Sequence, residues 1–273
     1  MPEELYGARF ESRWVVVGGL RVHARMSLSP VPLGPPVVLV HGLVVASTYL
    51  MPTAARLAER FRVFVPELPG FGRSERPKRP LSMSGLADAL AGWMDAMDLA
   101  RAAFLANSNG CQVVAALAER WPDRVERAVL TSPTIDPAGR SLLRQLGRWI
   151  VNSTREPPSL LPVLLKDYRA AGVRQSLGAL RETFRDRIEE RLPHVEAPTL
   201  VVRGERDPVV PQAWAERAAR LLKAGDLVVI PGAPHTLNWD VPGALCEVAV
   251  PFLEGRELHE EAARPLGSVG LSP

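Results

Sequence analysis

A serine stands where this chain changes abruptly from a strand to a helix. The apolar run 104–106 is followed by Asn107-Ser108-Asn109-Gly110, and an alanine-rich helical segment covers 113–120. Ala106 and Gly110, two positions on either side of Ser108, are small enough for the strand and the helix to pass close together. A turn this sharp holds the hydroxyl of its serine clear of the sheet. Ser108 is therefore a candidate nucleophile.

An acid and a histidine follow Ser108, each in a turn that comes after a strand-like run. Asp207 lies in the turn 204–211, shortly after the apolar run 198–202, and His235 follows the run 226–230. A serine hydroxyl is a poor nucleophile at neutral pH and needs a base within hydrogen-bond reach. Histidine suits that task because its unperturbed pKa of ~6.5 lies near neutral pH. Ser108, Asp207 and His235 together form a candidate catalytic set.

Strand-like and helical segments alternate along most of the chain, which predicts an α/β fold with a mostly parallel central sheet and helices on both faces. Gly18-Gly19 predicts a hairpin between the first two strands. The predicted strands are 14–17, 20–26, 37–40, 63–65, 102–106, 125–131, 198–202 and 227–230. The predicted helices of this core are 48–60, 84–97, 113–120, 212–222 and 241–253.

The alternation stops between residues 132 and 193, where apolar residues recur at helical spacing in two stretches. The first stripe is Leu142, Leu143, Leu146, Trp149 and Ile150, and the second is Leu160, Leu161, Leu164, Leu165 and Tyr168. Residues 177–192 are typical of a third, more polar helix. We expect 132–193 to be a helical insertion that packs partly on the main domain and partly over Ser108. Residues 1–131 and 194–256 then form the core, and 257–273 a flexible tail.

From about Val15 to about Leu253 the chain resembles the α/β-hydrolase superfamily. The segment 37–42, which ends in His41-Gly42, resembles the third strand of that family and its oxyanion loop. The segment 64–74 is similar to the turn D-x-P-G-x-G-x-S, with Glu67 where aspartate is usual. The serine turn resembles G-x-S-x-G, with Ala106 in place of the first glycine. The resemblance implies an α/β-hydrolase fold with a helical cap over residues 132–193.

The same resemblance implies a role for each member of the candidate set. Ser108 would be the nucleophile, His235 would take its proton, and Asp207 would orient the imidazole and stabilise the imidazolium. Glu205 close by, and Asp136 beyond the sixth strand, are alternatives for the acid. Relatives that hydrolyse epoxides or haloalkanes use an aspartate nucleophile, so the serine disfavours those activities.

An acyl transfer through serine also needs donors for the oxyanion that forms. In the family these donors are backbone N–H groups, one from the residue after the nucleophile and one from the loop after the third strand. By resemblance they are Asn109 and Leu43. We expect His41 itself to be structural.

The leading interpretation is a cofactor-independent serine hydrolase that cleaves a carboxylic ester or a lactone through an acyl-enzyme. Asparagine directly before the serine, here Asn107, resembles the serine turn of hydrolases that cleave carbon–carbon bonds in ring-cleavage products. That activity therefore remains an alternative. A ligand-binding protein of this fold, and acyl transfer or cyclisation, are further alternatives. The stripes predict a mainly apolar pocket for a small-molecule substrate, lined by residues such as Trp149 and Tyr168. Packing within the cap is the alternative role for those two side chains.

Composition adds little about function. Of 33 basic residues only Lys78, Lys166 and Lys223 are lysines, and the arginines are scattered instead of clustered. We therefore expect neither nucleic-acid nor membrane binding. The five histidines lack ligand spacing, so we expect no metal. The acidic start of the chain is unlike a secretory signal, which makes a soluble cytoplasmic protein the expectation; the oligomeric state is left open.

Overall fold

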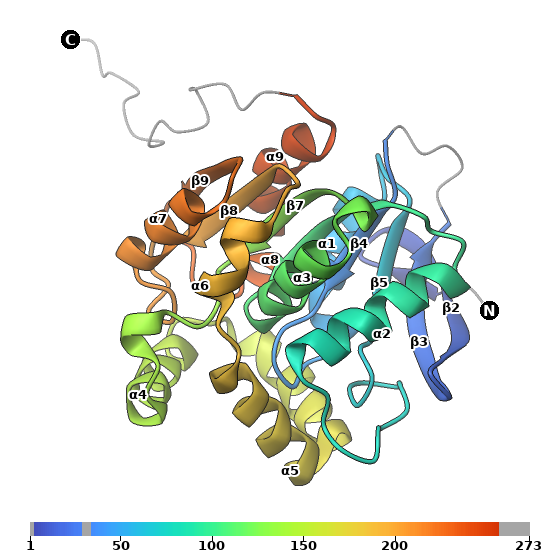
Figure 1. The fold of residues 1–273 in the computed structure, drawn as a ribbon, viewed down its shortest axis with the longest axis horizontal. Coiled ribbons are helices and arrows are strands. Elements are labelled where there is room, and N and C mark those ends of the chain that lie inside the picture. Colours follow the sequence, from blue (N-terminus) through green and yellow to red (C-terminus); the bar gives the residue numbers. More distant parts are fainter. Residues whose placement is uncertain (1–2, 29–33, 257–273) are drawn as a thin grey trace.

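The structure, a computed structural model, describes residues 3–28 and 34–256. Within these residues one nine-stranded sheet has the order β1-β2-β3-β5-β4-β6-β7-β8-β9 (Figure 1). The pairings β1–β2, β2–β3 and β3–β5 are antiparallel, and all later pairings are parallel. The strands are β1 (Glu3–Leu5), β2 (Ala8–Val17), β3 (Leu20–Ser27), β4 (Val37–Val40), β5 (Val63–Pro66), β6 (Ala102–Asn107), β7 (Val125–Thr131), β8 (Thr199–Gly204) and β9 (Gly225–Ile230).

The central strands are buried on both faces because helices cover the sheet on both sides. In β4, Val37 and Leu39 face one apolar core, while Val38 and Val40 face the other. Such strands give continuous apolar runs, as is typical of parallel sheets. The mostly parallel sheet and the hairpin at Gly18-Gly19 are therefore confirmed. Strand β1 was not predicted, because three residues with two glutamates carry no strand pattern.

Helices α2, α3 and α7 pack on one face of the sheet, and α1, α8 and α9 pack on the other. Figure 1 shows α2 and α3 in front of the sheet. These helices are α1 (Met51–Leu57), α2 (Met83–Ala96), α3 (Asn109–Arg120), α7 (Gln212–Leu221), α8 (Leu237–Asp240) and α9 (Pro242–Leu253). Short 3₁₀ segments are η1 (Ser47–Leu50), η2 (Pro122–Arg124), η3 (Pro137–Gly139), η4 (Pro158–Leu160) and η5 (Leu192–His194). None of the helices in the described part of the chain is long and apolar enough to span a bilayer.

Most of the segment 132–193 is helical, and its two longer helices lie beyond one end of the sheet (Figure 1). It contains α4 (Leu142–Ser153), α5 (Leu161–Arg185) and α6 (Ile188–Arg191). The second predicted helix and most of the third lie in α5, which is bent at Gly172, whose φ of 73° and ψ of 161° are not helical. The third was predicted to run from 177 to 192, but α5 ends at Arg185 and α6 follows it. The predicted tail 257–273 lies outside the described residues.

The expected packing of the first apolar stripe is wrong. Leu142, Leu143, Leu146 and Ile150 of α4 are exposed, and only Trp149 packs against the core. The side of α4 that faces inward carries the polar residues Gln145 and Asn152, which hydrogen-bond to Gly139 O and to Glu156 Oε1. The inward side of α4 therefore carries locally hydrogen-bonded polar residues and Trp149 in place of most of its apolar stripe.

A buried carboxylate ties the turn after β5 to the antiparallel edge of the sheet. Glu67 accepts hydrogen bonds from Ser47 Oγ at 2.5 Å and from Arg73 N at 2.5 Å, and it lies 3.2 Å from His23 Nδ1. It also lies 3.4 Å from the guanidinium of Arg25. Burial alone would raise the pKa of Glu67, but these partners outweigh burial and lower it to about 2. Both carboxylate oxygens of Glu67 thus have partners, Oε1 in Ser47 and Arg25, and Oε2 in Arg73 N and His23.

We predict that Glu67→Gln lowers the free energy of unfolding by about 3 kcal/mol at neutral pH, because it leaves the buried Arg25 guanidinium without its counter-charge. The pKa of Glu67 in the folded state, about 2, lies below the ordinary glutamate pKa of 4.5. The carboxylate therefore stabilises the fold above pH 4.5 and loses this effect as the pH falls towards 2. Urea unfolding across this range, with the exposed Glu59→Gln as control, measures it. A wild-type-to-variant difference that does not shrink in acid would contradict the prediction.

Candidate active site

Ser108 occupies a strained turn between β6 and α3. Its φ of 55° lies in the left-handed region that favours glycine, and such strain costs of order 1–3 kcal/mol. The Ser108 N–H donates to Thr131 O at 2.9 Å, which fixes the turn against the neighbouring strand β7. A Cβ on Gly110 would stand 2.5 Å from Val40 O, so only glycine lets α3 pass this close to β4.

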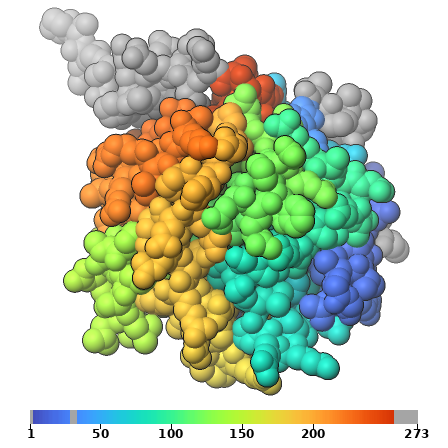
Figure 2. All heavy atoms as spheres, in the orientation of Figure 1, coloured from blue at the N-terminus to red at the C-terminus, as the bar shows by residue number. Residues whose placement is uncertain are grey.

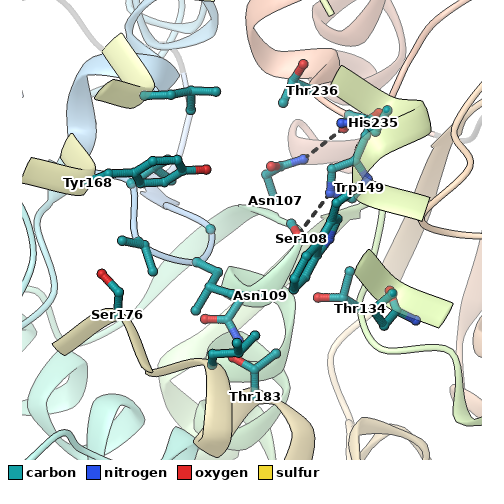
Figure 3. Close-up of a pocket in the computed structure, with 18 of the residues that line it drawn as sticks. Asn107, Ser108, Asn109, Thr134, Trp149, Tyr168, Ser176, Thr183, His235 and Thr236 are labelled. Carbon is teal, nitrogen blue, oxygen red and sulfur yellow. Dashed lines mark hydrogen bonds between the residues drawn. The ribbon is translucent and has the colours of Figure 1, made fainter. Parts of the chain in front are cut away.

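The structure brings Ser108, His235 and Asp207 together although they are far apart in the sequence. His235 Nε2 lies 3.0 Å from Ser108 Oγ (Figure 3). On the other side of the ring, His235 Nδ1 lies 2.8 Å from Asp207 Oδ2. Each residue follows the carboxyl end of a parallel strand: β6 for Ser108, β8 for Asp207 and β9 for His235. Parallel strands present these ends at one edge of the sheet, which explains the convergence.

Asp207 is held in place by the backbone of its own turn. Its Oδ1 accepts from Val209 N at 2.8 Å and from Val210 N at 3.1 Å, which leaves Oδ2 for the imidazole. The two alternative acids are engaged elsewhere. Asp136 pairs with Arg148 at 2.9 Å, and Glu205 accepts from Gly232 N at 2.8 Å.

The buried histidine and aspartate shift each other's pKa in opposite directions. Burial lowers the pKa of His235, but the attraction of the Asp207 carboxylate and the hydrogen bond to it outweigh burial, so the pKa is raised. Burial raises the pKa of Asp207, and the imidazole together with hydrogen bonds outweighs it, so that pKa is lowered. The ionised carboxylate therefore persists beside an imidazole that readily accepts a proton.

Leu43 and Asn109 line the same pocket as Ser108. Asn109 is the first residue of α3, where N–H groups have no acceptor within the helix. In the described part of the chain the Leu43 N–H donates to no other group. Two backbone donors thus remain available beside the serine.

A hydrogen-bond chain behind Ser108, which sequence reasoning missed, connects the loops that carry these groups. Gly42 N donates to Tyr49 Oη at 2.8 Å, and this hydroxyl donates to Asn107 Oδ1 at 2.9 Å. Asn107 Nδ2 in turn lies 3.1 Å from Thr131 Oγ1 and 3.4 Å from the carbonyl oxygen of His235. The chain joins the loop after β4, the serine turn and the histidine loop. Nothing in the sequence marked Tyr49, because it lies on the segment after the oxyanion loop without a motif of its own.

His41 is a buried support for the neighbouring loops. Its Nε2 accepts from Leu68 N at 2.9 Å, so its proton is on Nδ1, which donates to Gly42 O at 2.9 Å. Burial lowers the pKa of His41 and keeps the ring neutral.

A cavity of about 550 Å³ opens above Ser108 between the core and helices α4 and α5. Trp149 and Tyr168 both line it, and Figure 3 shows them on opposite sides of the serine. Much of the remaining wall is apolar, including Val44, Val45, Ile135, Leu164, Leu177 and Leu180. Among the described residues no lysine or arginine lines this cavity, and Glu156 is its one carboxylate.

Comparison with known proteins agrees with this architecture. A model of the alpha/beta hydrolase family matches residues 37–248. A pimeloyl-[acyl-carrier protein] methyl ester esterase of Stenotrophomonas maltophilia is 30% identical over 74% of this chain and 86% of its own length. A 2-(acetamidomethylene)succinate hydrolase of Mesorhizobium japonicum is 24% identical over 93% of this chain and 99% of its own. The crystal structure of the enol-lactonase from Burkholderia xenovorans LB400 superposes with a TM-score of 0.72 at 24% identity, over 88% of this chain and 99% of that one.

We predict that the imidazole of His235 titrates above its ordinary pKa of ~6.5 and that Asp207→Asn lowers this pKa, because the variant removes the negative charge that favours the imidazolium. An NMR titration of the histidine ring signals measures it. Asp136→Asn is the matched control and leaves the titration unchanged. If Asp136→Asn lowered the pKa of His235 and Asp207→Asn left it unchanged, the acid would be Asp136, in the segment after β7.

Proposed function

Because this chain belongs to the alpha/beta hydrolase family, we propose that it is a serine hydrolase that cleaves a carboxylic ester or a lactone. The observation that supports this is the hydrogen-bonded series Ser108–His235–Asp207 on the floor of a largely apolar cavity. A base in contact with the hydroxyl, and an acid in contact with the base, are what a serine nucleophile needs.

In the proposed reaction, Ser108 Oγ attacks the carbonyl carbon while its proton moves to His235 Nε2. The carbonyl oxygen becomes an oxyanion, which the N–H groups of Leu43 and Asn109 stabilise. Asp207 stabilises the imidazolium. The carbon–oxygen bond to the alcohol then breaks, and the alcohol leaves with the proton from Nε2. A water that gives its proton to the same nitrogen attacks the acyl-enzyme, and Ser108 regains its proton as the acid leaves.

The cavity lining favours an uncharged acyl group. Contact between its apolar side chains and an alkyl chain removes apolar surface from water, which favours binding. The nearby Glu156 carboxylate, by contrast, would repel an anion. A ring-cleavage product carries a carboxylate a few bonds from the bond that breaks, and no cation lines the wall to receive it. The lining therefore favours ester or lactone cleavage over the carbon–carbon alternative.

Helices α4 and α5 contribute a large share of the cavity wall, including Trp149 and Tyr168. We propose that the segment 132–193 acts as a cap that selects substrates by the shape of this wall. The specificity of enzymes with this fold depends on such site residues more than on the fold itself.

We predict that the wild type hydrolyses an activated hexanoate ester or a lactone but not a vinylogous dienone acid. Ser108→Ala lowers the rate by roughly 10⁴-fold or more, because it removes the atom that would be acylated. Asp207→Asn lowers it by roughly 10⁴-fold. Rates measured by absorbance, with Asp136→Asn as control, check this. Full activity in Ser108→Ala would end the proposal, and cleavage of the dienone acid alone would favour the carbon–carbon alternative.

We further predict that Tyr49 is a positioning residue. Tyr49→Phe leaves Gly42 N and Asn107 Oδ1 without a partner, at a cost of about 1–3 kcal/mol. The loop that carries the Leu43 N–H then loses its orientation, so kcat falls by about 10-fold with little change in KM. Tyr6→Phe, at an exposed hydroxyl, is the matched control. A loss confined to KM, or a loss fully explained by a lower melting temperature, would contradict this role.

A further inference from the structure

A second cavity, of about 350 Å³, adjoins the one above Ser108 at the bend of α5. One side of it comes from the segment between β5 and α2 and the other from residues 171–175. Gly172 and Val173 line both cavities, so the two are neighbours on either side of the bend. Figure 2 shows the corresponding two parts of the chain side by side at the lower edge of the molecule.

The second cavity is cationic, in contrast to the first. Arg76, Lys78 and Arg174 line it, and no aspartate or glutamate of residues 3–28 and 34–256 does. Both arginines are anchored across the cavity: Arg76 Nη2 donates to Ala170 O, and Arg174 Nη2 donates to Lys78 O at 3.1 Å. Each guanidinium keeps further N–H donors for a ligand. Because these hydrogen bonds already order the two arginine side chains, ligand binding would cost less conformational entropy.

The backbone at the bend adds to the positive character of this cavity. Since Gly172 is not helical, the helix resumes at Val173 and runs to Arg185. The N–H groups of its first turn have no intrahelical acceptors, and the helix dipole makes this end favourable for anions. Val173, Arg174 and Gln175 of that turn all line the cavity.

Gln175 is a buried polar residue whose side chain has no hydrogen-bond partner in the described part of the chain. Only 6% of it is exposed, and its side-chain amide forms no hydrogen bond with any described residue. Its Nε2 lies 2.2 Å from where a Cβ on Gly70 would stand, so glycine at that position makes room for the amide. Its amide lines the cavity and is free to hydrogen-bond a ligand or water there.

We propose that this second cavity binds an anionic group of the substrate, a phosphate or a carboxylate, while the acyl chain occupies the cavity above Ser108. The inference rests on the proposed ester hydrolysis for its catalytic half. The two cavities divide the recognition: the first has no cation and would repel an anion, and the second has cations and no acid. The substrate would then be an ester with a neutral linker between its acyl chain and its anionic end.

The test compares two series of hexanoate esters of linear diols, one ending in a free hydroxyl and the other in a phosphate, over a range of linker lengths. For the linker that fits, kcat/KM is higher for the phosphate than for the hydroxyl by about 10-fold or more, through a lower KM. Arg76→Gln and Arg174→Gln each reduce this phosphate-to-hydroxyl ratio by about 10-fold. Arg217→Gln, at an exposed arginine of α7, is the matched control and keeps the ratio of the wild type.

Binding to Ser108→Ala, measured by calorimetry, separates the two proposals because it needs no turnover. If the hydroxyl esters are hydrolysed but the phosphate gives no gain, the anion site is wrong and the hydrolase proposal stands. If no ester is cleaved, yet the phosphate ester binds to Ser108→Ala and Arg174→Gln abolishes that binding, the anion site stands and the hydrolase proposal fails. If inorganic phosphate binds through Arg174 but phosphate esters are not preferred, the cavity receives a free anion, and the assignment to a substrate group is overturned.

Discussion

The strained turn at Ser108 is the constraint on which the arrangement of this site depends. A non-glycine residue at a φ of 55° persists only where its surroundings hold it. Here the neighbouring strand supplies Thr131 O to the Ser108 N–H, and Gly110 lets α3 pack against the backbone of β4. The central strands β4, β6 and β7 are therefore placed around one turn, and the parallel pairing of β8 and β9 brings the acid and the histidine to the same edge.

Buried hydrogen bonds then connect the loops at that edge to one another. The series from Gly42 through Tyr49 to Asn107 ties the loop after β4 to the serine turn, and the Asn107 amide reaches the histidine loop. The side chain of Asn109 donates to Thr183 Oγ1 of α5 at 2.9 Å, so the same turn also holds the helical segment above it. In a buried setting each such polar group is costly unless paired, which makes the connected arrangement more favourable than a partly connected one. The core and the segment 132–193 thus both help to fix the positions of the candidate site residues.

Most of the sheet and the order of the candidate residues could be predicted from the sequence, because both depend on local patterns. Apolar runs such as 37–40 become buried parallel strands. The tight turn at Ser108 requires small residues beside it, and Gly110 is one of them. Where the outcome depends on contacts between distant segments, the sequence was insufficient. The apolar stripe of α4 gave no sign that Gln145 and Asn152 would face inward, because the side of α4 that is buried depends on how the whole helix packs against the core. Tyr49 and the cationic cavity at the bend of α5 likewise combine segments that are far apart along the chain.

Labelling by a serine-directed fluorophosphonate tests whether Ser108 is the residue that forms a covalent bond with the acyl group. We expect one adduct per chain in the intact-protein mass spectrum, located by peptide mapping on Ser108 and absent from Ser108→Ala. His235→Ala slows this labelling, because the hydroxyl loses the base that lies 3.0 Å from it. An adduct on a different residue, or turnover of esters by a protein that the reagent leaves unmodified and fully active, would contradict the account.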